Sequence, residues 1–284
     1  IHERLVGSEM CIRDRYEGAE VGDIWGYTVN DLFRSQEDLD SYLSKVDMTH
    51  IAANWNTGDL KYEDINHDGK VNNGTNTIGN HGDLSVIGND QPHYQYTING
   101  GVSYKGFDFS MLWRGVAKKD MYFYRGSNIY WGFMGGWWES CLTPEHLDYF
   151  RDQPGSKYSG LYEGDANINT DAYWPRPYLN NTEEAKNKNH ANTRYLQNAA
   201  YLRLQNVQLG YSFPRSITSK MHLEKLRIYF SGENLLTFSK LPSGIDPVAP
   251  VGFPTGGEFF GTAGSGRLTY GADRIYSIGL TVTY

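Results

Sequence analysis

The sequence lacks several features that would place a protein in a familiar class. Only two of its 284 residues are cysteines, Cys11 and Cys141, so a disulfide-rich framework is excluded and cysteine indicates no compartment. No run approaches the roughly 18 consecutive apolar residues of a membrane-spanning helix. Lys and Arg number 26 against 33 Asp and Glu, and this net charge of −7 argues against binding to nucleic acid.

Catalytic signatures are missing as well. The chain has no G-x-S-x-G, no H-E-x-x-H and no phosphate-binding loop, and its eight histidines are dispersed rather than set at metal-ligand spacing. Carboxylates are plentiful, but nothing in a single sequence pairs two of them. We therefore expect that the protein is not an enzyme.

The chain is rich instead in glycine and aromatic side chains, with 32 Gly, 22 Tyr and an aromatic content of 14%. This composition is typical of strands and turns. The mean hydropathy of −0.58 is in the range of soluble proteins. A membrane β-barrel has similar values, however, because only alternate residues of its strands face lipid.

Period-two alternation predicts the strands. The end of the chain carries its apolar residues on one face, while serine, glycine and threonine occupy the other; the apolar set is Tyr276, Ile278, Leu280, Val282 and Tyr284. Further strands are predicted at 94–104, 107–113, 206–213 and 226–231, with a glycine-rich first strand at 21–30. Lys105-Gly106 predicts a tight hairpin turn between the first two of these. Alternation alone fits either an ordinary half-buried strand or the closing strand of an outer-membrane barrel.

The lengths of the connections favour the barrel. Long loops at about 31–92, 119–199 and 239–270 alternate with short turns at 105–106 and about 214–223. Outer-membrane barrels have this arrangement, with short periplasmic turns and long extracellular loops. The predicted fold is therefore all-β: an antiparallel transmembrane β-barrel segment of about six strands. Six strands are too few to close a barrel of this kind, so the segment would belong to a larger one.

The start of the chain has a different character. Residues 5–15 resemble the translation of an adapter used in sequencing libraries, and an ordinary N-terminal loop is the alternative. We expect residues 1–15 to be a non-native leader and 16–284 to be the native barrel segment. On this interpretation an upstream part of the gene is missing.

The first long loop contains a calcium-like motif. Residues 64–69 read D-x-N-x-D-G, which places oxygen ligands from Asp64, Asn66 and Asp68, and the carbonyl of Lys70, around a tight bend. Thr75 stands where an EF-hand has its bidentate glutamate, so Asp59 or Asp83 would have to complete the shell. The motif therefore predicts either a structural Ca²⁺ site or a metal-free Asx-rich turn. Upstream of it, Ser35 predicts the cap of a helix over 36–44.

The second long loop contains a cluster of aromatic residues. Its members are Trp131, Trp137, Trp138, Tyr173 and Trp174. Such a cluster could bind substrate by stacking on sugar rings, or bind a partner protein, as aromatic hot spots do. Alternatively, the rings pack a small core within the loop and lie at the lipid interface.

Several of these stretches, taken in order, resemble the SusC/RagA family of TonB-dependent outer-membrane transporters. The segments that carry the resemblance are 26–27, 31–39, 58–70, 86–94, 104–110, 201–211, 231–237, 244–247 and the terminal strand. The resemblance implies the C-terminal part of a barrel of conventionally about 22 strands in the bacterial outer membrane. The aromatic last residue, with the alternating face that leads to it, would be the barrel-assembly signal.

The resemblance also implies a function and partners. A SusD-like surface lipoprotein would sit on the barrel, and oligosaccharides or peptides would be imported. Energy would come from TonB–ExbB–ExbD through a plug and a TonB-contacting segment that are absent from this sequence. Two alternatives remain open: a secreted calcium-dependent carbohydrate-binding β-sandwich, and a non-transporting outer-membrane barrel such as an adhesin or passive porin.

Overall fold

A computed structural model describes residues 17–123, 128–132, 142–157, 162–178, 181–248 and 272–284. The chain divides into two compact units, each of which is described by itself. Of the described residues, the sheet unit comprises 91–120, 197–248 and 272–284, and the loop unit comprises those within 17–90 and 121–196. The predicted leader, 1–15, lies outside the described residues.

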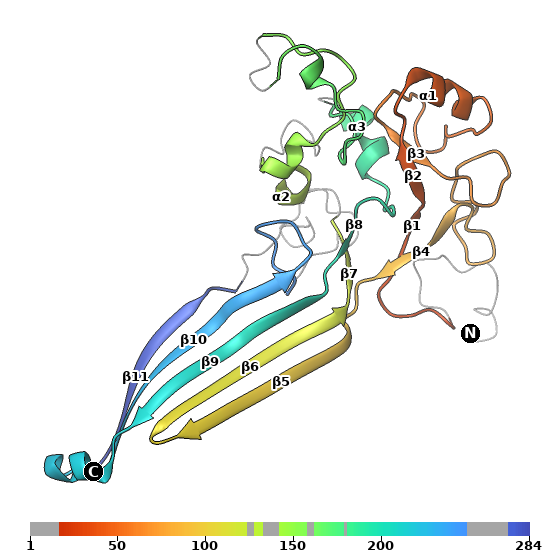
Figure 1. The fold of residues 1–284 in the computed structure, drawn as a ribbon. Coiled ribbons are helices and arrows are strands. Elements are labelled where there is room, and N and C mark those ends of the chain that lie inside the picture. The colour runs from red at the N-terminus through yellow and green to blue at the C-terminus, as the bar shows by residue number, and fades with distance from the viewer. Residues whose placement is uncertain (1–16, 124–127, 133–141, 158–161, 179–180, 249–271) are drawn as a thin grey trace. The chain divides into compact units, whose positions relative to one another are not determined.

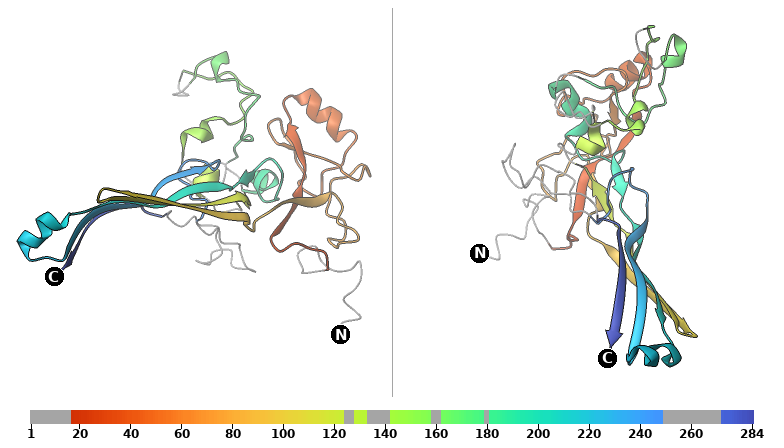
Figure 2. Two further views of the ribbon diagram at one scale, coloured as in Figure 1. Left: turned by 60° about the horizontal axis from the view of Figure 1, so that its bottom comes forward. Right: turned by 90° about the vertical axis from the view of Figure 1, so that its left-hand side faces the viewer.

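The sheet unit is built on one five-stranded antiparallel sheet with the strand order β11-β10-β9-β6-β5 (Figure 1). Its strands are β5 (His93–Tyr104), β6 (Phe107–Lys118), β9 (Tyr201–Ser212), β10 (Lys225–Ser239) and β11 (Ile275–Thr283). Four of them are 12 to 15 residues long and β11 is nine residues long, which is enough to cross a bilayer at a tilt. Figure 2 shows the sheet as a twisted and curved ribbon.

Two short connections join neighbouring strands at one end of this sheet. Lys105 and Gly106 link β5 to β6 with φ angles of 47° and 87°. Two consecutive positive φ angles are the requirement of a type I′ turn, so the predicted hairpin is confirmed. The second connection, from β9 to β10, contains α4 (Arg215–Thr218) and η5 (Ser219–Met221).

Irregularities in strand pairing keep the apolar residues of the sheet on one face. The register between β6 and β9 shifts between Leu112 and Trp113, and that between β9 and β10 shifts between Glu233 and Leu236. Asn234 has a φ of 53° within the second irregularity, where a bulged residue takes such a conformation. Because a one-residue slip reverses the faces of a strand, these bulges return Leu202 and Leu204 to the apolar side.

The loop unit contains short elements only. β1 (Asp23–Tyr27) pairs with β4 (Leu84–Asn89), and β2 (Val29–Leu32) pairs with β3 (Leu60–Tyr62). A further short pair is formed by β7 (Asp120–Tyr122) and β8 (Leu196–Asn198), two places where the chain passes from one unit to the other. The helical elements are α1 (Gln36–Leu43), α2 (Asn128–Trp131), η3 (Pro144–Leu147), η4 (Asp165–Asn167) and α3 (Asn181–Lys188).

Helix α1 confirms the predicted helix near 36–44. Ser35 caps it, because its Oγ accepts a hydrogen bond of 3.2 Å from the amide of Asp38. Glu37 and Asp38 lie in the first turn, where negative charge is favoured. Among the described helices, none combines the length and the apolar character needed to cross a bilayer.

The predicted strand at 21–30 was wrong in its placement. Its residues form β1 and β2, which pair within the loop unit and do not join the main sheet. The described sheet therefore has five strands rather than about six. Barrel closure is not seen in the described residues, where β5 and β11 are the two edges of this sheet.

Candidate functional site

The five-stranded sheet has one apolar face. Register places Tyr104, Phe107 and Tyr211 in one row near the short turns. The next two rows, each with one residue from β5, β6 and β9, are also apolar. They are Val102, Phe109 and Leu209, followed by Gly100, Met111 and Val207. Much of this face is exposed, from 38% for Tyr96 to 78% for Ile278. Apolar surfaces of this extent mark sites that contact another protein surface, a ligand or a membrane.

Aromatic rings bracket this face at both ends. Near the short turns, the rings of Phe107 and Tyr211 lie 4.6 Å apart, and Tyr211 also contacts Phe213. At the other end the aromatic residues include Trp113 and Phe238, whose rings stack at 6.3 Å. The terminal strand contributes to the same face, because Tyr276, Ile278, Leu280 and Val282 pair opposite Gly232, Phe230, Ile228 and Leu226. Tyr284 is 95% exposed.

The opposite face is polar and has an ion pair near its short-turn end. Arg227 Nη2 donates to Asp108 Oδ2 at 2.5 Å and its Nε donates to Asp108 Oδ1 at 3.0 Å. The same Nη2 also donates to Gln208 Oε1 at 3.2 Å. Gly210 lies beneath this group, and a Cβ there would come within 2.6 Å of both Asp108 oxygens. The glycine therefore leaves room for a charged cluster that joins β6, β9 and β10.

A second ion pair ties a loop to the long-loop end of the polar face. Arg203 donates to Asp246 Oδ1 at 2.6 Å and to Thr237 Oγ1 at 3.0 Å. The Asp246 carboxylate also accepts from the amides of Val248 and Ala272. Burial raises the pKa of Asp246, but the backbone hydrogen bonds and Arg203 outweigh it and hold that pKa below its usual value. Asp246 is thus fixed as a charged anchor on this loop.

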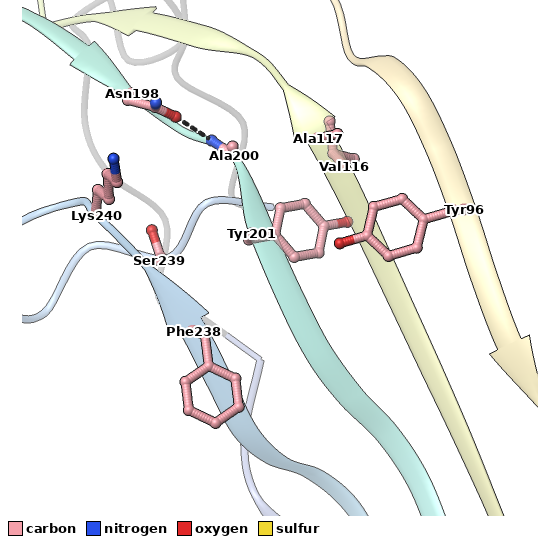
Figure 3. A pocket seen from close by; sticks show the side chains of 9 residues that line it. All are labelled: Tyr96, Val116, Ala117, Asn198, Ala200, Tyr201, Phe238, Ser239 and Lys240. Carbon is pink, nitrogen blue, oxygen red and sulfur yellow. Dashed lines mark hydrogen bonds between the residues drawn. The ribbon is translucent and has the colours of Figure 1, made fainter.

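A shallow hollow of about 390 Å³ opens at the same end of the sheet (Figure 3). Lys240 is the one charged residue of its lining. Its other residues are Tyr96, Val116, Ala117, Asn198, Ala200, Tyr201, Phe238 and Ser239. The Asn198 side chain accepts from the Ala200 amide at 2.9 Å and so serves the local turn. We assign no ligand to this hollow.

The calcium-like loop is closed by hydrogen bonds to its own backbone. Asp64 accepts from the amides of Asp68 and Gly69, at 3.2 and 2.8 Å. Asn66 Oδ1 accepts from the Asp68 amide at 3.0 Å, and Asp68 Oδ1 accepts from the Lys70 amide at 2.9 Å. These are the bonds of Asx turns. Gly69 has a φ of 80°, which suits the predicted bend.

The two acids suggested as additional ligands have different positions. Asp83 is buried beside the loop and accepts from the amides of Ile65 and Asn72, at 2.9 and 2.8 Å. Asp59 belongs to another cluster, described below. Within the described ranges, no three His, Cys, Asp or Glu side chains gather as a metal-binding group. The calcium site stays a prediction.

The aromatic cluster forms a small core within the loop unit. Trp131 and Trp174 are 0% and 3% exposed, and their ring centroids lie 5.8 Å apart. Trp174 also stacks on Tyr195 at 5.5 Å, while Trp131 Nε1 donates to the Phe123 carbonyl at 2.8 Å. The two tryptophans are therefore enclosed in the structure rather than presented at the surface.

The remaining aromatic residues differ in position. Tyr173 is half-buried, so part of its side chain is accessible to solvent. Its hydroxyl donates to the Arg194 carbonyl at 3.3 Å. Trp137 and Trp138 lie outside the described residues. A role of these aromatics in substrate or partner binding stays a prediction.

Sequence reasoning missed a buried ion pair in the loop unit. Lys186 Nζ lies 2.7 Å from Asp59 Oδ2, and both side chains are fully buried. Asp59 also accepts from the Tyr178 hydroxyl at 2.8 Å and from the Asn187 side chain at 2.9 Å. The sequence around Lys186 is polar, and a lysine in a polar helix is usually exposed to solvent. Nothing in the sequence therefore indicated that Lys186 is buried.

A second ion pair lies nearby. Arg176 bonds Asp152, and both also bond the Thr57 hydroxyl. Burial raises the pKa of Asp152, but the Thr57 hydrogen bond and the Arg176 charge outweigh it, so that pKa is below its usual value. Together with the Asp59–Lys186 pair, this contact joins segments that are far apart in the sequence.

Comparison with known proteins gives two kinds of match. No protein-family profile matches the chain. It is 25% identical to TonB-dependent receptor P3 of Formosa agariphila over 237 residues, and 24% identical to TonB-dependent receptor P26 of the same organism over 259 residues. These alignments cover 82% and 89% of the chain, which spans about a fifth of the length of these curated relatives (19% and 21%).

Solved structures match as well. The fold is similar to a chain of the RagAB peptide transporter, with a TM-score of 0.52, 16% identity and coverage of 93% of this chain and 23% of the other. A closed-closed state of the RagAB peptide importer gives a TM-score of 0.50 and 17% identity, with coverage of 94% and 23%. At this level of identity the likeness concerns the fold.

Proposed function

We propose that this chain, which is homologous to part of the TonB-dependent receptors, forms the C-terminal wall and external loops of an energy-coupled importer. TonB-dependent receptors reside in the bacterial outer membrane. They are transporters without enzymatic activity, in agreement with the expectation that this chain is not an enzyme. In the proposal, the five described strands belong to a closed barrel of conventionally about 22 strands.

The apolar face of the sheet is the observation that carries this proposal. Tyr96 and Tyr104 lie eight residues apart on β5, within the aromatic ends of the face. At about 3.3 Å per residue and a tilt near 40°, this separation spans roughly 20 Å of membrane thickness, close to the ~25 Å band of outer-membrane barrels. The polar face, with Arg227 paired to Asp108, would then line a wet lumen.

The sandwich alternative is disfavoured by the same face. A β-sandwich buries the apolar side of each sheet against a second sheet. In the described part of the chain, residues such as Ile98, Val102 and Ile278 are instead 53%, 64% and 78% exposed. A non-transporting barrel would share the face, but the homology with TonB-dependent receptors favours transport.

The cargo would be an oligomeric nutrient, either an oligosaccharide or a peptide, captured with a SusD-like surface lipoprotein. The solved structures with a similar fold are described as a peptide transporter and importer, which is a statement about those proteins. TonB–ExbB–ExbD would supply energy through other parts of the receptor. The half-buried Tyr173 is the described aromatic best placed for binding cargo or the lipoprotein. A structural Ca²⁺ in the 64–70 loop is part of the proposal.

Deletion of the receptor gene that encodes this chain tests the transport role. We expect the deletion strain to lose growth on one of two sole nutrients, a peptide mixture or an oligosaccharide mixture. Deletion of TonB should abolish growth on the same nutrient. Growth that is unchanged on both would contradict the transport proposal. Purified receptor should also need detergent and migrate differently in electrophoresis before and after boiling, whereas a β-sandwich would be a soluble monomer.

A further inference from the structure

The short-turn end of the sheet unit is basic, and four of its cations form no ion pair with a described residue. Lys105 lies in the hairpin turn, while Arg215, Lys220 and Lys225 lie in or directly after the helical turn between β9 and β10. All four are exposed, and none forms an ion pair with a described residue. We call these four cations the short-turn rim.

Few negative charges oppose the rim. Asp108 is already paired with Arg227, so this pair is neutral. Glu224 is the remaining acidic side chain at this end of the described sheet. The rim therefore keeps a net positive charge with no cluster inside the unit to neutralise it.

Apolar side chains accompany these cations. Ile217 and Met221 both lie in the helical connection between β9 and β10, and they are 45% and 55% exposed. The turn projects from the end of the sheet, beside the C-terminus in Figures 1 and 2. Exposed apolar residues next to Lys and Arg are typical of segments that lie in a membrane interface.

The adjoining strand ends have the same character. Tyr104 and Phe107 flank the hairpin turn and are 67% and 56% exposed. Lys105 Nζ lies 5.1 Å from the Tyr104 ring centroid. Aromatic rings with nearby cations mark the level of lipid headgroups, where the rings contact acyl chains and the cations contact phosphates.

We propose that the short-turn rim binds the phosphate of anionic phospholipid headgroups in the leaflet that surrounds this end of the barrel. The inference rests on the proposed function, since it requires the apolar face to contact lipid. Charge complementarity selects anionic over zwitterionic lipid, while Ile217 and Met221 insert among the acyl chains. In the orientation given by short periplasmic turns, this is the inner leaflet of the outer membrane.

The test uses the receptor that contains this chain, reconstituted in phosphatidylcholine vesicles. Trace spin-labelled phosphatidylglycerol or spin-labelled phosphatidylcholine reports the association constant of each lipid with the protein. We expect a preference for phosphatidylglycerol that falls about threefold in the triple variant Arg215→Gln, Lys220→Gln, Lys225→Gln. Lys105 is left in place because its positive φ belongs to the hairpin turn.

A matched variant removes three exposed cations from the other end of the same sheet: Lys118→Gln, Lys240→Gln, Arg274→Gln. It should keep most of the preference, because the total change in charge is equal but the location differs. No preference in the unaltered receptor, no loss in the rim variant, or an equal loss in the matched variant would each overturn the proposal. If millimolar inorganic phosphate displaced the spin-labelled phosphatidylglycerol, the rim would be a site for free phosphate. That result would overturn the proposal that it binds lipid.

Insertion is measured separately, by the change in electrophoretic migration on boiling. A receptor that fails to insert in any form counts against the proposed function. A receptor that inserts normally and shows no lipid preference counts against the rim alone.

Discussion

Lys186 Nζ lies 2.7 Å from Asp59 Oδ2 in the loop unit, and neither side chain is exposed to solvent. The ammonium also donates to the Asn54 carbonyl at 2.9 Å and to Glu183 Oε2 at 3.2 Å, and it lies 4.7 Å from the centre of the Tyr178 ring. A buried charge with this many partners is tolerated because each of its donors is satisfied. The pair therefore joins helix α3 to the segment that leads into β3.

Removing one member of this pair should be strongly destabilising. Lys186→Met leaves the Asp59 carboxylate buried without its cation, so the loop unit should lose about 3–5 kcal/mol. Hydrogen exchange of segments 54–62 and 183–188 in the intact receptor would measure the loss as faster opening. The half-buried pair Lys61–Asp38 provides the control, because Lys61→Met leaves a carboxylate that solvent still reaches and should therefore cost less than Lys186→Met.

A double variant distinguishes charge from packing. Replacing both members, as Asp59→Leu with Lys186→Met, should cost less than Lys186→Met alone, because no unpaired charge is then buried. If the double variant is instead the less stable one, the pair stabilises the fold through its own geometry.

Gly279 on β11 should not tolerate a side chain. The Tyr229 ring of the neighbouring strand covers it, and an added Cβ would collide with that ring. Gly279→Ala should therefore displace Tyr229 and lower the yield of folded receptor, with a cost of about 1–3 kcal/mol. The fraction with heat-modifiable migration would measure this.

Removing the ring should relieve the collision. Gly279→Ala combined with Tyr229→Ala is expected to recover part of the folded fraction relative to Gly279→Ala alone. Gly244 provides a contrasting position, because no atom of the described residues lies within 4 Å of its added Cβ and the strain there comes from a φ of 87°. Equal yields for Gly279→Ala and the unaltered receptor would show that the ring does not occupy this space.

Acidification should loosen the loop unit through His190. Burial lowers the pKa of His190 below its usual value of 6.5, and the nearby His50 lowers it further. Because the pKa is lower in the folded state than in the unfolded one, protonation favours unfolding. Stability is then complete above about pH 6.5 and falls as the pH drops below it. Limited proteolysis at about pH 7.5 and about pH 5.5 would show the change.

His190→Gln should reduce this pH dependence, since glutamine does not titrate in this range. The ring packs edge-on against Tyr27 at 5.8 Å, so the variant will also lose some packing at neutral pH. The informative quantity is the difference between the two pH values. A difference as large in the variant as in the unaltered receptor would assign the acid sensitivity to other groups.

Calcium binding by the 64–70 loop can be separated from its turn geometry. Asp68→Asn keeps an oxygen that accepts the Lys70 amide but removes a charge that Ca²⁺ requires. If the metal binds, millimolar Ca²⁺ should slow hydrogen exchange of this loop in the unaltered receptor and have little effect on the variant. Protection that is the same with Ca²⁺ and with a chelator would identify a metal-free turn.

The buried tryptophans Trp131 and Trp174 should stabilise the loop unit. Trp131→Ala removes a fully buried ring that contacts Trp174 and Tyr195, so a loss of about 3–5 kcal/mol is expected. Tyr173→Leu, at a half-buried position, should cost less. Hydrogen exchange of the loop unit compares the two. A loss of cargo or lipoprotein binding in Tyr173→Leu with unchanged exchange would support the binding role.

The sequence by itself determined the features that depend on neighbouring residues. Alternation of apolar and polar residues identified the five strands of the sheet and the apolar face of the last one, because side chains on a strand alternate with period two. Lys105-Gly106 identified the hairpin, since the type I′ turn requires two positive φ angles. Ser35 identified the start of α1 through its side-chain oxygen.

Only the tertiary structure decided what depends on distant partners. The segment 21–30 has the composition of a sheet strand, yet β1 pairs with β4 some sixty residues later, and no local pattern encodes that choice. Asp59 meets Lys186 across more than a hundred residues, which redirects a candidate metal ligand into an ion pair. Bulges at Leu112 and Glu233 set which face each strand presents. Pairing and burial are properties of the assembled fold, because they arise from contacts that a single segment does not contain.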